Sequence, residues 1–180
     1  LANLMLTVVY YLFLPLRFTD AFPFLAVSPA PLPSWEFTEA MPGGLFAIAP
    51  LALAAFACPF LRRRTHSAEG RGMWALSVSC LVLGLLLVVI DSRMAGLGWR
   101  YITDFGWLFA LAALPALSCV LDVARPRPRL RWLARAGFLA LLLFMIIVTL
   151  LSLFLPGRDD ELLRNNPGLF LDVQSWFSML

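Results

Sequence analysis

The sequence contains no lysine, a single histidine and only three cysteines in 180 residues. His66 has no second histidine with which to form a zinc site. Most acids are predicted to lie on the other side of the membrane from His66, so we expect no Ser-His-Asp set. Cys58, Cys80 and Cys119 lie in apolar runs without the spacing of a metal or redox motif, so we interpret them as small buried residues. The glycine pair in "MPGGL" (41–45) lacks the lysine of a phosphate-binding loop. We therefore expect no metal and no cofactor, and no stretch identifies a catalytic residue.

Long apolar runs dominate the residues that are present. Hydrophobic residues make up 61% of the chain, whereas a soluble domain contains roughly 45–50%. Charge is absent from the middle of every run, which argues against an ion pathway or a proton relay within this segment. The composition predicts an all-α fold, a polytopic bundle of transmembrane helices.

Five runs approach the roughly 20 apolar residues that a crossing requires. We predict one transmembrane region over residues 1–180, with spans at about 1–14, 43–61, 73–90, 104–121 and 137–155 and an external tail at 156–180. The first run is short, with no charged segment before it and no cleavage site after it, so it is not a signal peptide. We interpret the chain as a fragment cut inside a helix, with the remainder of the same polypeptide as a partner. Pro50 and Pro115 lie midway in their spans, where each is expected to kink its helix.

The arginines are distributed unequally between the connections. Loops 62–72 and 122–136 together hold nine arginines and two acids, whereas the other connections and the tail hold five arginines and nine acids. Arginine-rich short loops stay in the cytoplasm, so loop 15–42 and the C-terminus are predicted to be extracytoplasmic. Membrane lipids account for these clusters better than nucleic acid does. Arginine without lysine, with abundant alanine, leucine and proline, indicates a GC-rich genome and hence a bacterial plasma membrane.

Two external segments carry their own apolar residues. Loop 15–42 contains six prolines and many aromatic residues, so it is either a structural cap or a functional loop. In the tail, Asn166 is expected to cap a helix that begins at Pro167. One face of that helix is apolar, which predicts an amphipathic helix in the outer interface, or else one packed on a partner helix. The apolar face consists of Leu169, Phe170, Val173, Trp176, Phe177 and Leu180.

The stretch "GWRYITDFGW" (98–107) gathers charge at the outer membrane interface. Its aromatic residues predict an interfacial belt, and Thr103 or Asp104 is expected to cap the following helix. Arg100 lies on the side that is poor in arginine, so it needs a partner, which could be Asp104, Asp91 or a lipid phosphate. The candidates for binding a ligand or a lipid phosphate are Arg100, Tyr101, Asp104, Arg93 and Asp91.

Four short phrases, "PLRFTDAFPF", "WEFTE" with "PGGL", "RYITDF" and "NNPGLF", resemble the C-terminal part of large polytopic proteins of actinobacterial type. Some of these proteins are grouped with the GT-C type of glycosyltransferase. The resemblance implies a polyprenyl-phosphate-linked sugar as partner and action at the external face. It also implies that Arg100, Tyr101 and Asp104 help to form the donor-lipid or acceptor side of a cavity. The catalytic carboxylate of the family lies in an early external loop, and no residue of this chain matches it.

Two other classes of function stay open. A transporter or flippase would carry an internal repeat, and residues 43–90 and 104–155 are loosely alike: each has an alanine-rich helix with a proline, a cysteine, an arginine loop and a leucine-rich helix. A structural membrane protein would need no chemistry at all, and its charged groups would only anchor helix ends.

Overall fold

The computed structural model describes residues 2–64, 68–155 and 162–177. His66 and parts of the predicted external tail lie outside these residues. The described chain is mostly helical with almost no sheet, which confirms the all-α fold class. The elements are α1 (Ala2–Phe13), β1 (Arg17–Phe18), β2 (Leu25–Ala26), α2 (Leu45–Ile48), the 3-10 helix η1 (Pro50–Arg64), α3 (Ala68–Met94), the 3-10 turn η2 (Trp99–Tyr101), α4 (Ile102–Ala124), α5 (Pro128–Ser152), α6 (Leu162–Asn165) and α7 (Pro167–Phe177).

Three helical segments are long and apolar enough to cross a membrane. They cover Glu69–Met94, Trp99–Ala124 and Pro128–Ser152, and so correspond to the third, fourth and fifth predicted spans. The first two predicted spans form shorter helices, so five crossings are not confirmed.

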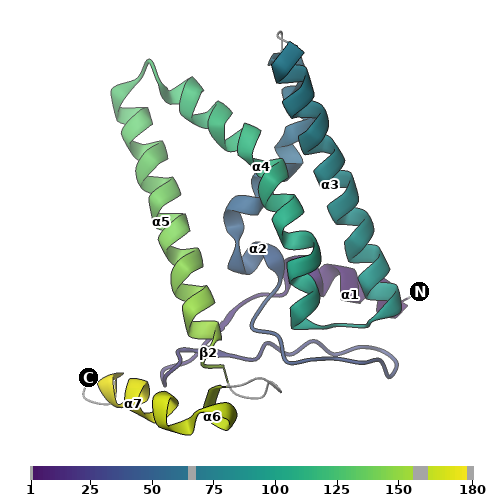
Figure 1. Cartoon of the computed structure of the whole chain (residues 1–180), viewed down its shortest axis with the longest axis vertical. Coiled ribbons are helices and arrows are strands. Elements are labelled where there is room, and N and C mark those ends of the chain that lie inside the picture. Colours follow the sequence, from purple (N-terminus) through teal and green to yellow (C-terminus); the bar gives the residue numbers. More distant parts are fainter. Residues whose placement is uncertain (1, 65–67, 156–161, 178–180) are drawn as a thin grey trace.

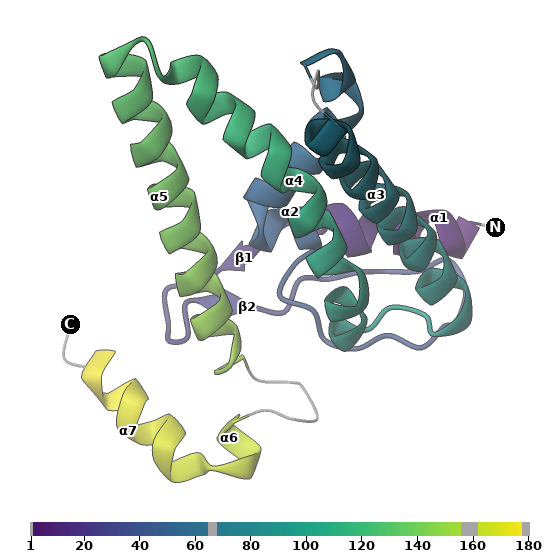
Figure 2. The ribbon, with the colours of Figure 1, turned by 45° about the horizontal axis from the view of Figure 1, so that its top comes forward.

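Helix α1 lies across the molecule instead of along it. Figures 1 and 2 show it at the lower end of α3 and α4, crossing the direction in which both run. Its C-terminal turn meets the entry to α2, where the Gly44 amide donates to the Leu14 carbonyl at 2.7 Å. A Cβ atom on Gly44 would lie 2.6 Å from the backbone of both Tyr10 and Leu14. Only glycine allows this approach, so α1 is held tightly against the second apolar segment.

The two span prolines act as the sequence predicts, in different ways. Helix α2 ends at Ile48, and the chain continues from Pro50 as the 3-10 helix η1. Helix α4 continues through Pro115, and the ribbon changes direction partway along it (Figures 1 and 2). Proline removes one backbone donor and crowds the preceding turn, which accounts for both the break and the bend.

Small residues bring η1, α3 and α4 together. Ala52 and Ala55 of η1 are buried, as are Ala112, Ala113 and Ala116 of α4, which fits the close helix approach expected from the alanine-rich segments. Phenylalanine rings pack in the same core, where Phe109 lies edge-on to Phe46 at 5.5 Å between centroids. This core also takes in residues of α1.

The arginine-rich connections gather at one end of the molecule. Figure 1 shows the α4–α5 turn and the start of α3 at the upper end. The hairpin of β1 and β2, the α3–α4 connection, and helices α6 and α7 lie at the lower end (Figure 1). The alternation of basic and acidic connections in the sequence therefore corresponds to two separate ends in space.

Loop 15–42 packs over the lower end as a cap. Strands β1 and β2 pair antiparallel within it, with Arg17 opposite Ala26. Its two ends meet at buried Ser28, whose hydroxyl oxygen lies 2.6 Å from the Pro15 carbonyl and 3.0 Å from the Pro42 carbonyl. The loop therefore forms a structural cap, which is one of the two roles that the sequence leaves open for it.

The tail helix α7 docks onto this cap. Asn166 accepts a hydrogen bond from the Leu169 amide at 3.2 Å, which confirms it as the N-cap of a helix that begins at Pro167. Phe22 of the loop is within 5.7 Å, centroid to centroid, of Phe170 and Phe177 of α7 and of Phe154 at the end of α5. One edge of α7 thus packs on the protein. Leu169 and Trp176, on the other edge, remain exposed.

Candidate functional site

A buried tyrosine joins α1 to the connection between α3 and α4. The Tyr11 hydroxyl donates to the Gly96 carbonyl at 2.8 Å and accepts from the Gly98 amide at 2.9 Å. Its ring is fully buried and meets Phe105 of α4 edge-on, at 5.5 Å between centroids. One side chain therefore satisfies two buried backbone groups of a tight loop and fixes where α4 begins.

The same loop pairs with the cap. The Leu97 amide donates to the Phe37 carbonyl at 2.9 Å, and the Glu39 amide donates to the Leu97 carbonyl at 2.7 Å. Gly96 has φ +77°, and a Cβ atom there would lie 2.4 Å from the Phe37 carbonyl oxygen. Glycine is required at this position for both conformation and space. Residues 37–39 and 96–98 thus form one rigid unit with α1.

This unit decides the partner of Arg100. The Arg100 guanidinium forms an ion pair with Glu39 at 2.5 Å and lies 5.6 Å from the ring centroid of Tyr101. The partner is therefore Glu39 of the cap, instead of the expected Asp91 or Asp104. The Arg100 side chain is 65% exposed, so this pair stabilises the fold only weakly. Binding of a lipid phosphate by Arg100 or Tyr101 stays a prediction.

The start of α4 also differs from the prediction. The 3-10 turn η2 leads directly into a helix that begins at Ile102. Tyr101 is the N-cap residue of this helix, and its side chain forms no capping hydrogen bond. Thr103 is already inside the helix, where its hydroxyl donates to the Arg100 carbonyl at 2.6 Å. The N-cap predicted at Thr103 or Asp104 is therefore wrong, because the loop held by Tyr11 brings the chain into helical conformation earlier. Asp104 still lies in the first turn, where the helix dipole favours an acid.

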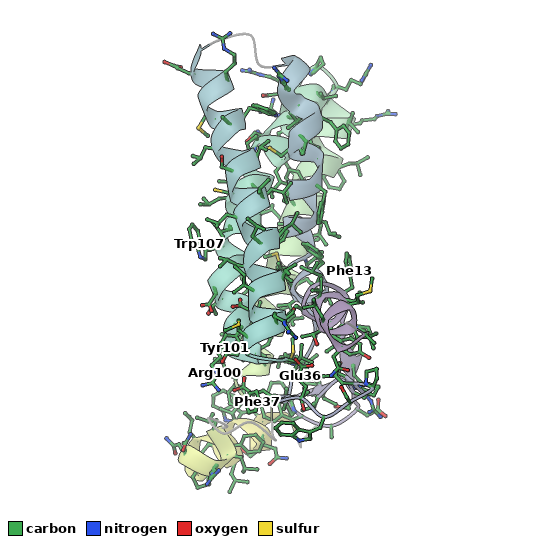
Figure 3. All side chains as sticks on the ribbon, turned by 90° about the vertical axis from the view of Figure 1, so that its right-hand side faces the viewer. Phe13, Glu36, Phe37, Arg100, Tyr101 and Trp107 are labelled. Atoms are coloured by element: carbon green, nitrogen blue, oxygen red, sulfur yellow. The ribbon has the colours of Figure 1, made fainter. Side chains whose placement is uncertain are left out.

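The charged candidates lie at the same end of the molecule but do not form one cluster. Figure 3 shows Glu36, Phe37, Arg100 and Tyr101 near one another at the lower end, with Trp107 farther along α4. Asp91 has one buried carboxylate oxygen with no hydrogen bond in the part of the chain that the structure describes. The like charge of Asp104 interacts unfavourably with it.

Arg93 lies in a cavity that Glu36 and Phe37 also line and that Arg100, Tyr101 and Asp104 do not. The cavity has a volume of about 520 Å³ and lies between the start of α1, cap residues 33–37 and the end of α3. This volume falls in the range of ligand pockets, about 300–1,000 Å³. On one wall Asn3 and Ser34 bond to each other, with the Asn3 amide donating to the Ser34 hydroxyl at 2.7 Å.

The other walls carry polar groups that are not satisfied. Ser92 is 1% exposed. Within the described residues, neither its hydroxyl nor the buried Oε2 of Glu36 has a hydrogen-bond partner. Arg93 is exposed and, among the same residues, forms no ion pair. Buried polar groups are normally bonded. This cavity therefore has an exposed cation on it, and its wall holds a buried acceptor and a buried hydroxyl whose hydrogen-bonding capacity is unused.

A metal is a poor match for this cavity. Among the described residues, no three His, Cys, Asp or Glu side chains lie close enough to hold an ion. The chemistry on offer is hydrogen bonding and charge recognition.

Sequence reasoning identified Arg93 but missed Glu36, Glu39 and Tyr11. The two glutamates lie in "WEFTE", on the same predicted side as Arg93 and Arg100, so opposite charge on one face is a signal that could have paired them. Tyr11 lies in an apolar run, where no sequence pattern distinguishes it from its neighbours.

The chain matches no family model, no curated protein and no solved structure. The chemistry of the cavity therefore rests on its own residues, and the resemblance to GT-C enzymes stays a prediction.

Proposed function

We propose that the chain is the membrane-embedded part of a multispan protein that holds the phosphate of a lipid at its extracytoplasmic end, with Arg93 as the phosphate ligand. The observation that carries this proposal is the exposed, unpaired guanidinium in a cavity with unsatisfied polar walls. Guanidinium suits a phosphate because its planar donors match two oxygens at once. Arg93 is favoured over Arg100, whose charge is already met by Glu39.

The orientation follows from the arginines. With loops 62–72 and 122–136 in the cytoplasm of a bacterial cell, the cap and α7 face outward. Four crossings then account for this alternation, made by η1 and the three long helices. The 12 residues of η1 that precede its three arginines extend about 24 Å at ~2.0 Å per residue, and with the 4 residues of α2 before them they approach a hydrocarbon core of about 30 Å. The crosswise α1 gives the fifth crossing no support.

A lipid-linked sugar transferase is one finer form of this proposal, the one that the resemblance implies. The phosphate would then belong to a polyprenyl-phosphate-linked sugar, as the resemblance implies. The cavity supports it by its place at the outer end of α3 and by its polar walls. A transporter or flippase has less support, since the two halves that resemble each other in sequence differ in structure: one contains a 3-10 helix and the other an α-helix.

The test is Arg93→Gln in the complete protein. We expect binding of a polyprenyl phosphate, measured by native mass spectrometry of the purified protein, to weaken by about tenfold or more, the size of one charge-assisted hydrogen bond. Arg100→Gln is the matched control, and it should change binding much less. Equal binding by the wild type and the Arg93→Gln variant would remove the proposal.

Orientation can be tested separately with a cysteine probe. Ser34→Cys places the probe in the cap, where the residue is exposed. We expect a membrane-impermeant thiol reagent to label it in intact cells. Labelling only after the cells are broken would reverse the orientation.

A further inference from the structure

We infer that the cavity beside Arg93 selects a phospholipid whose headgroup carries a primary amine, of the phosphoethanolamine type. This inference rests on the proposed function and specifies its ligand. It begins with two opposite charges in one cavity.

Glu36 and Arg93 both line this cavity, yet in the described part of the chain they form no ion pair with each other or with any other residue. Glu36 is partly buried and so lacks the partner that such charges normally have, while the exposed Arg93 carries the opposite charge without a protein partner. An anionic ligand would satisfy Arg93 and leave Glu36 without a partner, and a cationic ligand would do the reverse. A headgroup with a phosphate and a cation satisfies both.

The hydrogen-bonding groups decide which cation fits. The buried Oε2 of Glu36 is an acceptor without a donor, and the Ser92 hydroxyl also lacks a partner among the described residues. A primary ammonium offers three donors, whereas a quaternary ammonium offers none. The cavity therefore favours ethanolamine over choline.

The rim of the cavity points to a lipid instead of a soluble molecule. Trp35 is 94% exposed, Met94 is 81% exposed and Phe37 is 46% exposed, and all three line the cavity. Large apolar side chains at the end of a membrane helix are stable where acyl chains and headgroups meet, and tryptophan is enriched there. A lipid can place its headgroup in the cavity while its glycerol and upper acyl carbons cover this rim.

A polyprenyl-phosphate-linked sugar is the competing ligand. It carries a phosphate and hydroxyl donors but no cation, so it would leave the Glu36 carboxylate without a counter-charge. The two ligands therefore differ in their dependence on Glu36 and agree in their dependence on Arg93.

The experiment measures lipid preference by native mass spectrometry of the purified complete chain. The probes are phosphatidylethanolamine, phosphatidylcholine, phosphatidylglycerol and a polyprenyl phosphate, with matched acyl chains in the three phospholipids. For the wild type we expect phosphatidylethanolamine to bind about tenfold more tightly than each of the others, as one charge-assisted contact provides. Soluble glycerophosphoethanolamine should bind at least about tenfold more weakly than the lipid, because it covers no rim.

Three variants connect the preference to the cavity. Glu36→Gln should abolish the preference for phosphatidylethanolamine over phosphatidylglycerol, and Arg93→Gln should weaken binding of all four lipids. Ser92→Ala removes a hydrogen-bonding group without a charge and should weaken phosphatidylethanolamine a few-fold. Asp20→Asn is the matched control, since Asp20 is an exposed acid of the cap that does not line the cavity. It should leave the preference unchanged.

The outcomes separate the inference from the proposed function. Equal binding of phosphatidylethanolamine and phosphatidylcholine, or a preference that survives Glu36→Gln, would contradict the selection of a headgroup with a primary amine. Tighter binding of the polyprenyl phosphate that still depends on Arg93 would overturn the amine and support the proposed function. If soluble glycerophosphoethanolamine binds as tightly as phosphatidylethanolamine, the inference that the ligand is a lipid is wrong. Insensitivity of every probe to Arg93→Gln would remove both proposals.

Discussion

Helices α4 and α5 are both long and apolar, but they differ in what surrounds them. About 33% of the most apolar window of α4 is buried inside the protein, against 6% for α5. Helix α4 belongs to a packed core with α1, η1 and α3. Helix α5 leads to α6 and α7, and its few buried residues, Val148 and Ser152, lie near its end. These three helices form a peripheral arm that touches the cap at its tip.

The difference shows that similar hydrophobicity can be used in two ways. In the core, apolar side chains and alanines bury each other, and a buried hydrogen-bonded loop fixes the geometry. In the arm, most apolar surface is left for acyl chains, and rings at the tip provide the attachment. Changes in the core loop should therefore destabilise the fold, whereas changes at the tip should release the arm.

The largest effect is expected for Gly96→Ala in the core loop. The new Cβ atom would lie 2.4 Å from the Phe37 carbonyl oxygen, at a backbone φ of +77°. Strain and overpacking together should lower the free energy of unfolding by about 3–4 kcal/mol. Unfolding of the purified protein in detergent measures this loss.

Gly137→Ala in the arm is its control. No atom lies within 4 Å of a Cβ atom at that position, which is inside a helix, so we expect stability to rise by about 0.5–1 kcal/mol. Similar losses for both variants would show that the core and the arm do not differ in packing.

A smaller effect is expected for Tyr11→Phe. The variant keeps the ring but leaves the Gly96 carbonyl and the Gly98 amide without their partner. Two buried backbone groups without a bond should cost about 2–3 kcal/mol. Tyr10→Phe is the matched neighbour, because the Tyr10 hydroxyl donates to the exposed Pro31 carbonyl at 3.0 Å. If both variants lose the same stability in detergent, the buried bridge is not what fixes the loop.

The sequence predicts the positions of the helices better than the contacts that orient them. The run at 73–90 predicts most of α3, because a continuous apolar stretch of that length has few alternatives. The run at 1–14 predicts a crossing, yet α1 lies across the molecule. Its direction is set by Gly44 and by the Tyr11 bridge, which are contacts between residues far apart in sequence. Hydrophobicity carries no information about such contacts.

The same limit applies to the site. Arginine on an acid-rich side indicates that Arg100 needs a partner, and this follows from charge alone. Which acid pairs with which arginine depends on how the cap folds over the helix ends. That fold places Glu39 against Arg100 and leaves Glu36 and Arg93 in a shared cavity.

Phe22→Ala tests the attachment of the arm. The Phe22 ring stacks on Phe177 at 5.1 Å and meets Phe170 at 5.7 Å, centroid to centroid. Its loss should weaken the docking of α7 by about 1–2 kcal/mol, since each aromatic pair is worth ~0.5–1.5 kcal/mol. We expect faster hydrogen exchange in α7 and unchanged exchange in α4. Phe18→Ala removes a ring that is 61% exposed and should alter neither helix. Faster exchange throughout the core would mean that the arm and the core unfold together.

The smallest effect is expected for the ion pair between Arg100 and Glu39. It joins the cap to the start of α4, but solvent reaches 65% of the arginine side chain and 21% of the glutamate side chain. Exposed pairs contribute about 0–1 kcal/mol. A double-mutant cycle with Arg100→Gln and Glu39→Gln should therefore give a coupling energy in that range, which decreases as salt is added. A coupling above about 2 kcal/mol would place this pair with Tyr11 among the contacts that fix the core. A coupling within the expected range would mean that the backbone hydrogen bonds of Leu97 and the Tyr11 bridge, and not the exposed Arg100, hold the cap to α4.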